Sequence, residues 1–203
     1  MDKAKVVCVL KSGGIYTPEY VERLKKSCLE NGVDSFLCLT DIPQVSEICD
    51  TIDLVSGFPG WWSKLEIFKL PLGRYVYIDL DTIINNDITE ILTYPHTFTM
   101  LKDFNKKVSR PASGVMAWGD KDFSYIHDNF KESMIERYDP RRGGSLGDQA
   151  YISDTLKFKP DYLQTLFPGS VSSYKWDTYE TKQQSKIICY HGRPRPHETG
   201  WKK

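Results

Sequence analysis

The sequence predicts an α/β domain with a mostly parallel central sheet flanked by helices. Short β-branched runs alternate with helical patterns along the chain, which is the pattern of strands joined by crossover helices. Hydrophobic residues make up 40% of the chain and charged residues 27%, as in ordinary globular proteins. No repeat or linker divides the sequence, so we expect a single domain over residues 1–203; the alternative is the N-terminal domain of a longer enzyme.

The first part of the chain reads as strand, helix and two strands. Residues 5–10 (KVVCVL) are β-branched and stop at a Lys-Ser-Gly-Gly turn. Thr17 as N-cap and Pro18 at the first helical position open a helix, which Asn31-Gly32 closes. Residues 35–39 and 51–55 are expected to form the next two strands.

A helix over residues 61–70 then leads into the strongest strand of the chain, residues 74–80 (RYVYIDL). Later, the pattern predicts strands at 97–101, 114–118 and 187–190, and helices at 122–138 and 147–156. The stretch 139–147 (DPRRGGSLG) is rich in Gly and Arg and is expected to be a flexible loop.

Composition excludes several classes of protein. Lys plus Arg equals Asp plus Glu at 27 each, so we expect no nucleic-acid partner. No apolar run approaches the ~20 residues of a membrane span, so none is expected. Five cysteines without a CxxC pair favour a reducing compartment, and we expect a cytoplasmic protein.

Two acids end the strongest strand, Asp79 and Asp81. Residues i and i+2 of an extended segment point to the same side, so their carboxylates are expected to converge. Oxygen ligands of this kind suit Mg²⁺ or Mn²⁺, and open α/β sheets bind ligands beyond the carboxyl ends of their strands. The alternative is a structural pair that caps Asn85-Asn86 and the helical turn after them.

This segment resembles the D-x-D region of GT-A-fold glycosyltransferases, in which two acids hold a cation that bridges the donor's phosphates. Other segments resemble family motifs in the same order: residues 62–68 (WSKLEIF), 113–116 (SGVM), 147–150 (GDQA) and 190–196 (YHGRPRP), the last similar to the H-x-G-x-x-K-P ending of glycogenin-like members. In that ending the spacing is compressed, and Arg193 or Arg195 replaces the usual Lys.

The resemblance implies a GT-A-like domain and a metal-dependent glycosyltransferase of the hexosyl type. It would transfer a sugar from a nucleotide diphosphate donor, expected to be a UDP-sugar, to a hydroxyl of a glycan or other acceptor. His191 would join Asp79 and Asp81 as a metal ligand, and a nitrogen ligand favours Mn²⁺ over Mg²⁺. The alternative for His191 is a hydrogen-bonded, partly buried histidine, whereas His96, His127 and His197 are expected to be surface or packing residues.

Donor contacts are expected from several segments. Lys64, Arg193 and Arg195 are candidates for the diphosphate, because positive charge there stabilises the leaving group in the transition state; solvated surface charge is the alternative. Tyr16 can stack on the base, and Asp53 can accept from a uracil N–H or a ribose hydroxyl. The remaining expected contacts are backbone or small-residue positions: Lys11, Ser12 and Gly13 at the nucleoside, Ser113 and Gly114 at the sugar, Leu80 between the acids, and Gly192 beside the histidine.

Asp148 and Gln149 are the catalytic candidates. Asp148 would bind donor hydroxyls or deprotonate the acceptor, and the alternative is an acid favoured by the helix dipole in a first turn. Gln149 would lie near the reacting carbon, with retention or inversion left open. The 139–147 loop is expected to close over the donor and exclude water. One of Trp61, Trp62 and Trp118 is expected to offer an acceptor platform.

Two other functions remain open from the sequence. A nucleotidyltransferase would carry a Gly-rich first loop with Arg and Lys, and Lys11-Ser12-Gly13-Gly14 is too short for that. A sugar-nucleotide-binding domain without turnover shares the fold, but an intact set of Asp79, Asp81 and His191 argues against it.

Overall fold

The computed structural model describes residues 2–105, 107, 110–140 and 147–200. A seven-stranded sheet forms its centre, in the order β3-β2-β1-β4-β7-β6-β8. Its strands are β1 (Lys5–Leu10), β2 (Phe36–Thr40), β3 (Asp50–Asp53), β4 (Tyr75–Ile78), β6 (Phe98–Lys102), β7 (Pro111–Trp118) and β8 (Asp161–Tyr162). Within the described residues, β7 alone runs against the other six. The predicted α/β class and mostly parallel sheet are therefore confirmed.

A second, three-stranded sheet stands beside the first. It consists of β5 (Thr82–Ile84), β10 (Ile187–Cys189) and β9 (Val171–Ser173), with β10 in the middle. β10 pairs antiparallel with β5 and parallel with β9. The small sheet therefore joins the end of β4 to the C-terminal part of the chain, which lies far away in the sequence.

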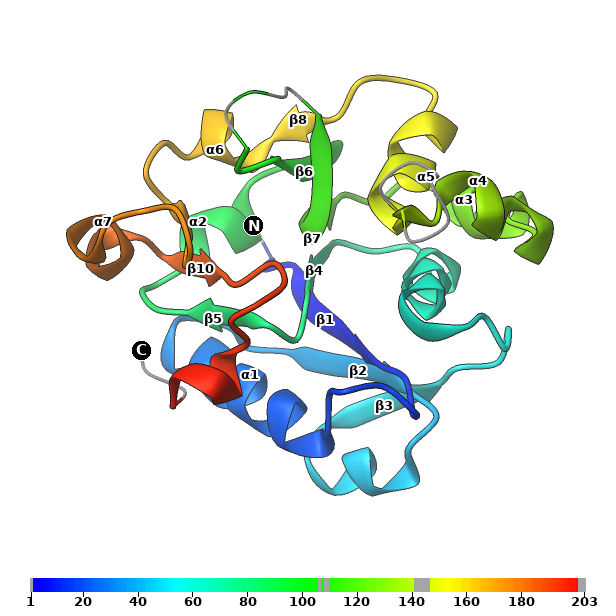
Figure 1. The fold of residues 1–203 in the computed structure, drawn as a ribbon, viewed down its shortest axis with the longest axis horizontal. Helices are drawn as coiled ribbons and strands as arrows, with labels where there is room; N and C mark the ends of the chain where they lie inside the picture. Colours follow the sequence, from blue (N-terminus) through cyan, green and yellow to red (C-terminus); the bar gives the residue numbers. More distant parts are fainter. Residues whose placement is uncertain (1, 106, 108–109, 141–146, 201–203) are drawn as a thin grey trace.

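Helices cover both faces of the large sheet. The α-helices are α1 (Pro18–Glu30), α2 (Thr89–Thr93), α3 (Ser124–Asp128), α4 (Ile135–Tyr138), α5 (Gly147–Thr155), α6 (Leu163–Leu166) and α7 (Tyr179–Gln184). Short 3₁₀ helices occupy Pro43–Glu47, Gly60–Lys69, Glu132–Met134 and Pro196–Thr199. In Figure 1, α1 and the small sheet lie on one side of β1, while α3, α4 and α5 lie on the other. No helix in the described part of the chain has the length and apolarity needed to cross a bilayer.

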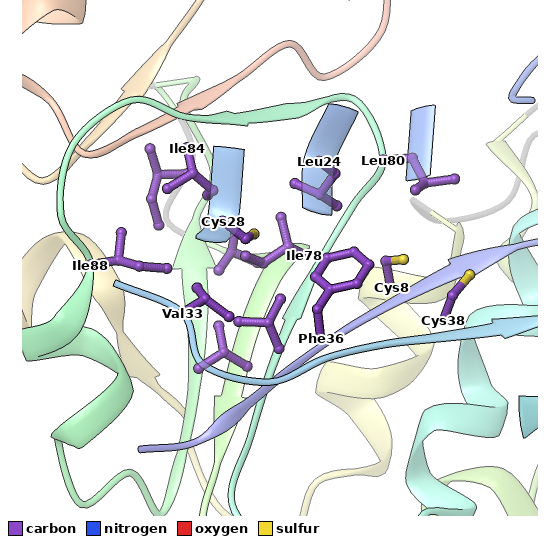
Figure 2. Close-up of a cluster of buried hydrophobic side chains, with 14 of the residues drawn as sticks. Cys8, Leu24, Cys28, Val33, Phe36, Cys38, Ile78, Leu80, Ile84 and Ile88 are labelled. Atoms are coloured by element: carbon purple, nitrogen blue, oxygen red, sulfur yellow. The ribbon is translucent and has the colours of Figure 1, made fainter. Parts of the chain in front are cut away.

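Successive residues of β1 belong in turn to two hydrophobic cores, because they point to opposite faces of the sheet. Val6 and Cys8 belong to the core beneath α1 and the small sheet, part of which Figure 2 shows. Val7 belongs to the other core, with Trp62 and Phe130. A strand buried on both faces reads as a continuous apolar run, which is why residues 5–10 were predictable.

Two predicted helices differ from the structure. Residues 60–69 form a 3₁₀ helix, in which side chains three apart share a face; the buried Trp62, Leu65 and Phe68 have that spacing. The expected helix over 122–138 is broken into α3, a 3₁₀ turn and α4. Phe130 sits at the break, and its ring stacks on Trp62 at a centroid distance of 4.7 Å. Tertiary packing at Phe130 therefore outweighs the local helical pattern.

The predicted strand over 74–80 also ends early, at Ile78. β5, β8, α6, β9 and α7 were not predicted, and α2 was expected only as a helical turn; each is between two and six residues long. Segments this short carry little periodicity of their own. Their conformation depends on distant partners, as where the backbone N–H of Asn85 donates to the carbonyl of Lys186 at 2.7 Å.

Candidate functional site

A cleft of about 790 Å³ opens where β1 and β4 end and where the small sheet meets the large one. It lies beyond the carboxyl ends of parallel strands, the position at which open α/β sheets bind ligands. Among the described residues, the cleft brings together most of the predicted site residues: Lys11, Ser12, Gly13, Tyr16, Lys64, Asp79, Leu80, Asp81, Ser113, Gly114, Asp148, Gln149, His191, Gly192 and Arg195.

Two predicted donor contacts lie outside this cleft. Asp53 is exposed on the edge strand β3 and pairs through its backbone with Thr40. The Arg193 side chain is 83% exposed and forms an ion pair with Glu198. The structure therefore does not place either side chain with the other predicted residues.

The structure leaves one of the three tryptophans as a candidate acceptor platform and does not test the closure of the 139–147 loop. Trp61 lines the cleft and is 38% exposed, whereas Trp62 and Trp118 are buried in the core and cannot serve as an acceptor platform. Residues 141–146 of the predicted 139–147 loop lie outside the described residues, so the structure leaves its expected closure untested.

Asp79 and Asp81 occupy a turn between the two sheets, and not the end of one extended strand. The backbone N–H of Asp79 still donates to the carbonyl of Gly114 at 2.8 Å, which extends the ladder by one residue. The N–H of Thr82 then donates to the carbonyl of Asp79 at 3.1 Å and closes the turn. The i, i+2 geometry expected of an extended segment is thus wrong here, yet both side chains line the cleft.

Asp79 is held from the floor of the cleft. Its Oδ1 accepts from the ammonium of Lys64 at 3.0 Å and from the hydroxyl of Tyr77 at 2.5 Å. Burial raises the pKa of Asp79 to about 6; Lys64 opposes the shift, and the charges of Asp81 and Asp148 add to it. Near neutral pH the carboxylate is therefore charged but easily protonated.

Lys64 joins Asp79 to the candidate catalytic segment. Its ammonium lies 2.8 Å from Asp148 Oδ2, and Ser113 Oγ donates to the same oxygen at 2.6 Å. Burial favours the neutral amine, but Asp148 and Asp79 hold the pKa of Lys64 above its ordinary value. Lys64 is 6% exposed, so this cation belongs to the buried structure beneath the cleft.

Asp81 is held by a different set of side chains. Its Oδ2 accepts from the hydroxyl of Tyr16 at 3.0 Å and from the guanidinium of Arg195, whose carbon lies 5.4 Å from the centre of the Tyr16 ring. Burial and, next, the charge of Asp81 raise the pKa of Tyr16 above its ordinary range, so its phenol stays protonated and donates. Asp81 therefore has a cationic partner of its own.

The carboxylate oxygens of Asp79 and Asp81 suit a divalent cation, although both side chains contact other partners. Neither Asp79 Oδ2 nor Asp81 Oδ1 has a hydrogen-bond partner among the described residues. A Cβ at Gly114 would lie 3.4 Å from Asp79 Oδ2, so the glycine leaves space in front of that oxygen. As arranged, no three acidic, His or Cys side chains of the described chain converge on one point.

The net charge of this network also favours a bound divalent cation. Asp79, Asp81 and Asp148 carry three negative charges, and Lys64 and Arg195 carry two positive ones. A diphosphate adds further negative charge, which a cleft with a net negative network would repel. A bound divalent cation would reverse that balance.

His191 lines the cleft, and its backbone lies in the left-handed region, at a φ of 34°. Its Nε2 is 2.6 Å from Ser173 Oγ, and its ring stacks on Phe104 at 4.9 Å. Burial and, next, the charge of Lys175 lower the pKa of His191, which favours the neutral imidazole that metals bind. The histidine is within the cleft, but its Nε2 is turned to Ser173.

Asp41 holds two residues that line the cleft, and sequence reasoning missed it. Its carboxylate accepts from Lys11 Nζ, the backbone N–H of Ser12 and Ser12 Oγ, each at 2.7 Å. These hydrogen bonds outweigh burial and hold the pKa of Asp41 at about 2. Asp41 follows β2 directly, so the rule that sites form beyond carboxyl ends could have found it in place of Asp53.

Phe104 and Asp103 were also missed, and both line the cleft. Asp103 follows β6 by one residue and Phe104 by two, so the same rule applies to them. Trp176, which packs edge-on against His191 at 5.0 Å, gave no signal because its turn forms only when β9 and β10 pair.

Solved structures of glycosyltransferases share this fold. GlyE of Streptococcus pneumoniae TIGR4 matches 96% of this chain with a TM-score of 0.66 at 18% identity, and the match covers 56% of GlyE, so the chain spans just over half of that enzyme. The galactosyltransferase LgtC, solved with donor and acceptor sugar analogues, matches 95% of this chain with a TM-score of 0.67 at 12% identity, and 88% of LgtC is covered. Mouse xyloside xylosyltransferase 1 matches 94% with a TM-score of 0.52 at 13% identity, over 98% of its own chain.

The chain therefore has the GT-A fold, as the sequence motifs predicted. No protein-family profile matches it, and no curated protein sequence does. At these identities the likeness concerns the fold, and the chemistry of the cleft has to be argued from its own residues.

Proposed function

We propose that this protein is a metal-dependent glycosyltransferase that uses a nucleotide diphosphate sugar. The observation that carries the proposal is the Asp79–Asp81 turn. It stands in the cleft of a GT-A fold, and each acid keeps one carboxylate oxygen without a partner among the described residues. A structural pair would be expected to use these oxygens to cap backbone groups. Asn85 and Asn86 instead donate their side-chain amides to carbonyls between residues 182 and 185.

Asp79 and Asp81 would hold the cation, with His191 as the third ligand after its ring turns from Ser173. The two oxygens and one nitrogen favour Mn²⁺, with Mg²⁺ as the alternative. When bound, the metal supplies positive charge that stabilises a diphosphate leaving group. Arg195 is the second positive group on the same wall, and Lys64 keeps Asp79 and Asp148 in position from below.

The nucleoside would lie at the end of β1. Lys11 and Ser12 are fixed there by Asp41, and Gly13 has a φ of 80°, which an L side chain rarely adopts. Tyr16 offers its ring beside this turn, although its hydroxyl is engaged with Asp81. We infer a uridine nucleotide. Leu80 and Gly192 contribute the neighbouring walls of the cleft.

The transferred sugar would lie over Ser113, Gly114 and Asp148. Asp148 Oδ2 is committed to Lys64 and Ser113, which leaves Oδ1 to accept from a sugar hydroxyl. Gln149, next on α5, lines the same part of the cleft and would contact the reacting region. The acceptor is a hydroxyl compound such as a glycan. It would enter past Trp61.

The five cysteines are all buried and none is paired in a disulfide, a pattern that suits a reducing compartment, and we propose a cytoplasmic enzyme.

Titration calorimetry with UDP, in Mn²⁺ and in EDTA, tests the proposal. We expect UDP to bind at least about tenfold more tightly with Mn²⁺, a difference of about 1.4 kcal/mol. A panel of UDP-sugars incubated with Mn²⁺ should then show slow release of UDP from one of them. Equal binding of UDP with and without Mn²⁺ contradicts metal dependence, and tight binding without any release or transfer identifies a binding domain.

A further inference from the structure

The contact between Arg195 and Asp81 affects how the cleft would bind a metal ion and a nucleotide. The backbone of Arg195 is anchored, because its N–H donates to Glu198 Oε2 at 2.7 Å. Its side chain, by contrast, contacts two groups at the cleft wall, the carboxylate of Asp81 and the hydroxyl of Tyr16. The side chain is 23% exposed. The guanidinium can therefore turn about a fixed backbone position.

Arg195 and a divalent cation would compete for Asp81. Both neutralise the same carboxylate, and two positive groups at one acid repel each other. The same repulsion acts at Asp79, but Lys64 is 6% exposed and is also paired with Asp148, so it is held in place. Metal binding at the turn therefore weakens the hold of Asp81 on Arg195.

A diphosphate offers Arg195 a better partner. A guanidinium can donate two parallel hydrogen bonds to phosphate oxygens, which suits it to this ligand. Asp81 and Arg195 line one cleft, so a diphosphate on a cation at Asp81 lies next to that guanidinium. The donor diphosphate would thus bind the Arg195 guanidinium that the metal displaces from Asp81.

We propose that Arg195 is an exchangeable counter-ion, which neutralises Asp81 in the empty cleft and transfers to the donor diphosphate when a divalent cation takes Asp81. The inference rests on the proposed function. Its consequence is positive coupling, because each ligand removes a cost of binding the other. Reciprocity requires that the metal strengthen nucleotide binding by the factor by which the nucleotide strengthens metal binding.

The test measures Mn²⁺ binding by electron paramagnetic resonance and UDP binding by calorimetry, for the whole chain and two variants. In Arg195→Gln, Mn²⁺ alone should bind about fivefold more tightly or better, while UDP binds more weakly and the coupling shrinks. Arg193→Gln is the matched control, since Arg193 is two residues away, exposed and paired with Glu198. It should leave both affinities within twofold of the wild type, about measurement error.

A second variant keeps the proposal open to refutation if Arg195→Gln fails to fold. Asp81→Asn removes the charge that holds Arg195, so UDP in EDTA should bind more tightly than to the wild type. Unchanged or weaker binding of UDP there overturns the inference, as does Mn²⁺ binding to Arg195→Gln that is no tighter. If the wild type binds neither Mn²⁺ nor UDP, the proposed function itself fails.

Discussion

Asp79 and Asp81 are two residues apart in one turn, yet the protein neutralises them in different ways. The cation beside Asp79 is Lys64, which is buried in the floor and shared with Asp148. The cation beside Asp81 is Arg195, which comes from the segment after β10 and is more exposed. One acid is therefore paired with a buried cation and the other with a partly exposed one. An acidic pair in a sequence gives no sign of this division.

The largest expected difference between the two cations is in the unfolding free energy of variants that lack them. Lys64→Met removes one partner from a buried ion network and leaves Asp79 and Asp148 uncompensated, which should cost about 3–5 kcal/mol of unfolding free energy. Arg195→Met should cost less, about 1–3 kcal/mol, because Arg195 is 23% exposed and only one acid loses its cation. Urea denaturation at pH 7 measures both. Similar losses would mean that the two cations are equally structural.

The effect of Asp81→Asn on UDP binding is expected to be the next largest. Asp81→Asn should weaken Mn²⁺-dependent UDP binding by about 100-fold or more, because the cation loses a charged ligand. Its unfolding free energy should fall by about 1–3 kcal/mol, because Asp81 is 7% exposed and Arg195 loses its charged partner. Asp53→Asn, on the exposed edge strand, is the matched control and should keep wild-type binding. An Asp81→Asn protein that still binds UDP in a Mn²⁺-dependent manner would remove this acid from the ligands.

The pH dependence of metal binding tests the role of Asp79. Because the pKa of Asp79 is raised to about 6, a proton competes with the metal below that pH. Mn²⁺ affinity should be nearly constant above pH 7 and should fall as the pH drops through 6, by up to about tenfold per unit. Titrations between pH 8 and 5 check the sign. An affinity that is flat down to pH 5 would show that Asp79 is not a ligand.

The smallest expected effect concerns the third ligand. His191→Ala should weaken Mn²⁺ by about tenfold and Mg²⁺ by less, since Mg²⁺ prefers oxygen. Ser173→Ala, which removes the hydroxyl beside His191 Nε2, should leave Mn²⁺ binding intact if the ring has to turn away from it. Equal losses of the two metals in His191→Ala would exclude the histidine as a ligand.

The central sheet was largely predictable because its strands are buried on both faces and carry continuous apolar runs. β1 and α1 match the sequence pattern almost to the residue. The small sheet was not predictable as a sheet. β5 and β9 have three residues each, and both owe their conformation to pairing with β10, more than a dozen residues from either. The break at Phe130 likewise depends on Trp62, which a helical pattern cannot include.

The candidate site was predicted by motif order more than by geometry. Residue types alone could not choose between Arg193 and Arg195, and the structure turns one to solvent and the other to Asp81. Nor could they find Asp41, because its partner Lys11 lies on another strand's end. The convergence of Lys64 with two acids required the buried 3₁₀ helix, which the sequence presented as an ordinary helix.

A crystal of the protein soaked with MnCl₂ and UDP, with anomalous data recorded at the manganese edge, tests the central claim most directly. We expect one anomalous peak within bonding distance of Asp79 Oδ2 and Asp81 Oδ1, with the UDP phosphates beside it. A nucleotide bound in the cleft with no peak at these oxygens, or a peak elsewhere on the chain, would contradict it.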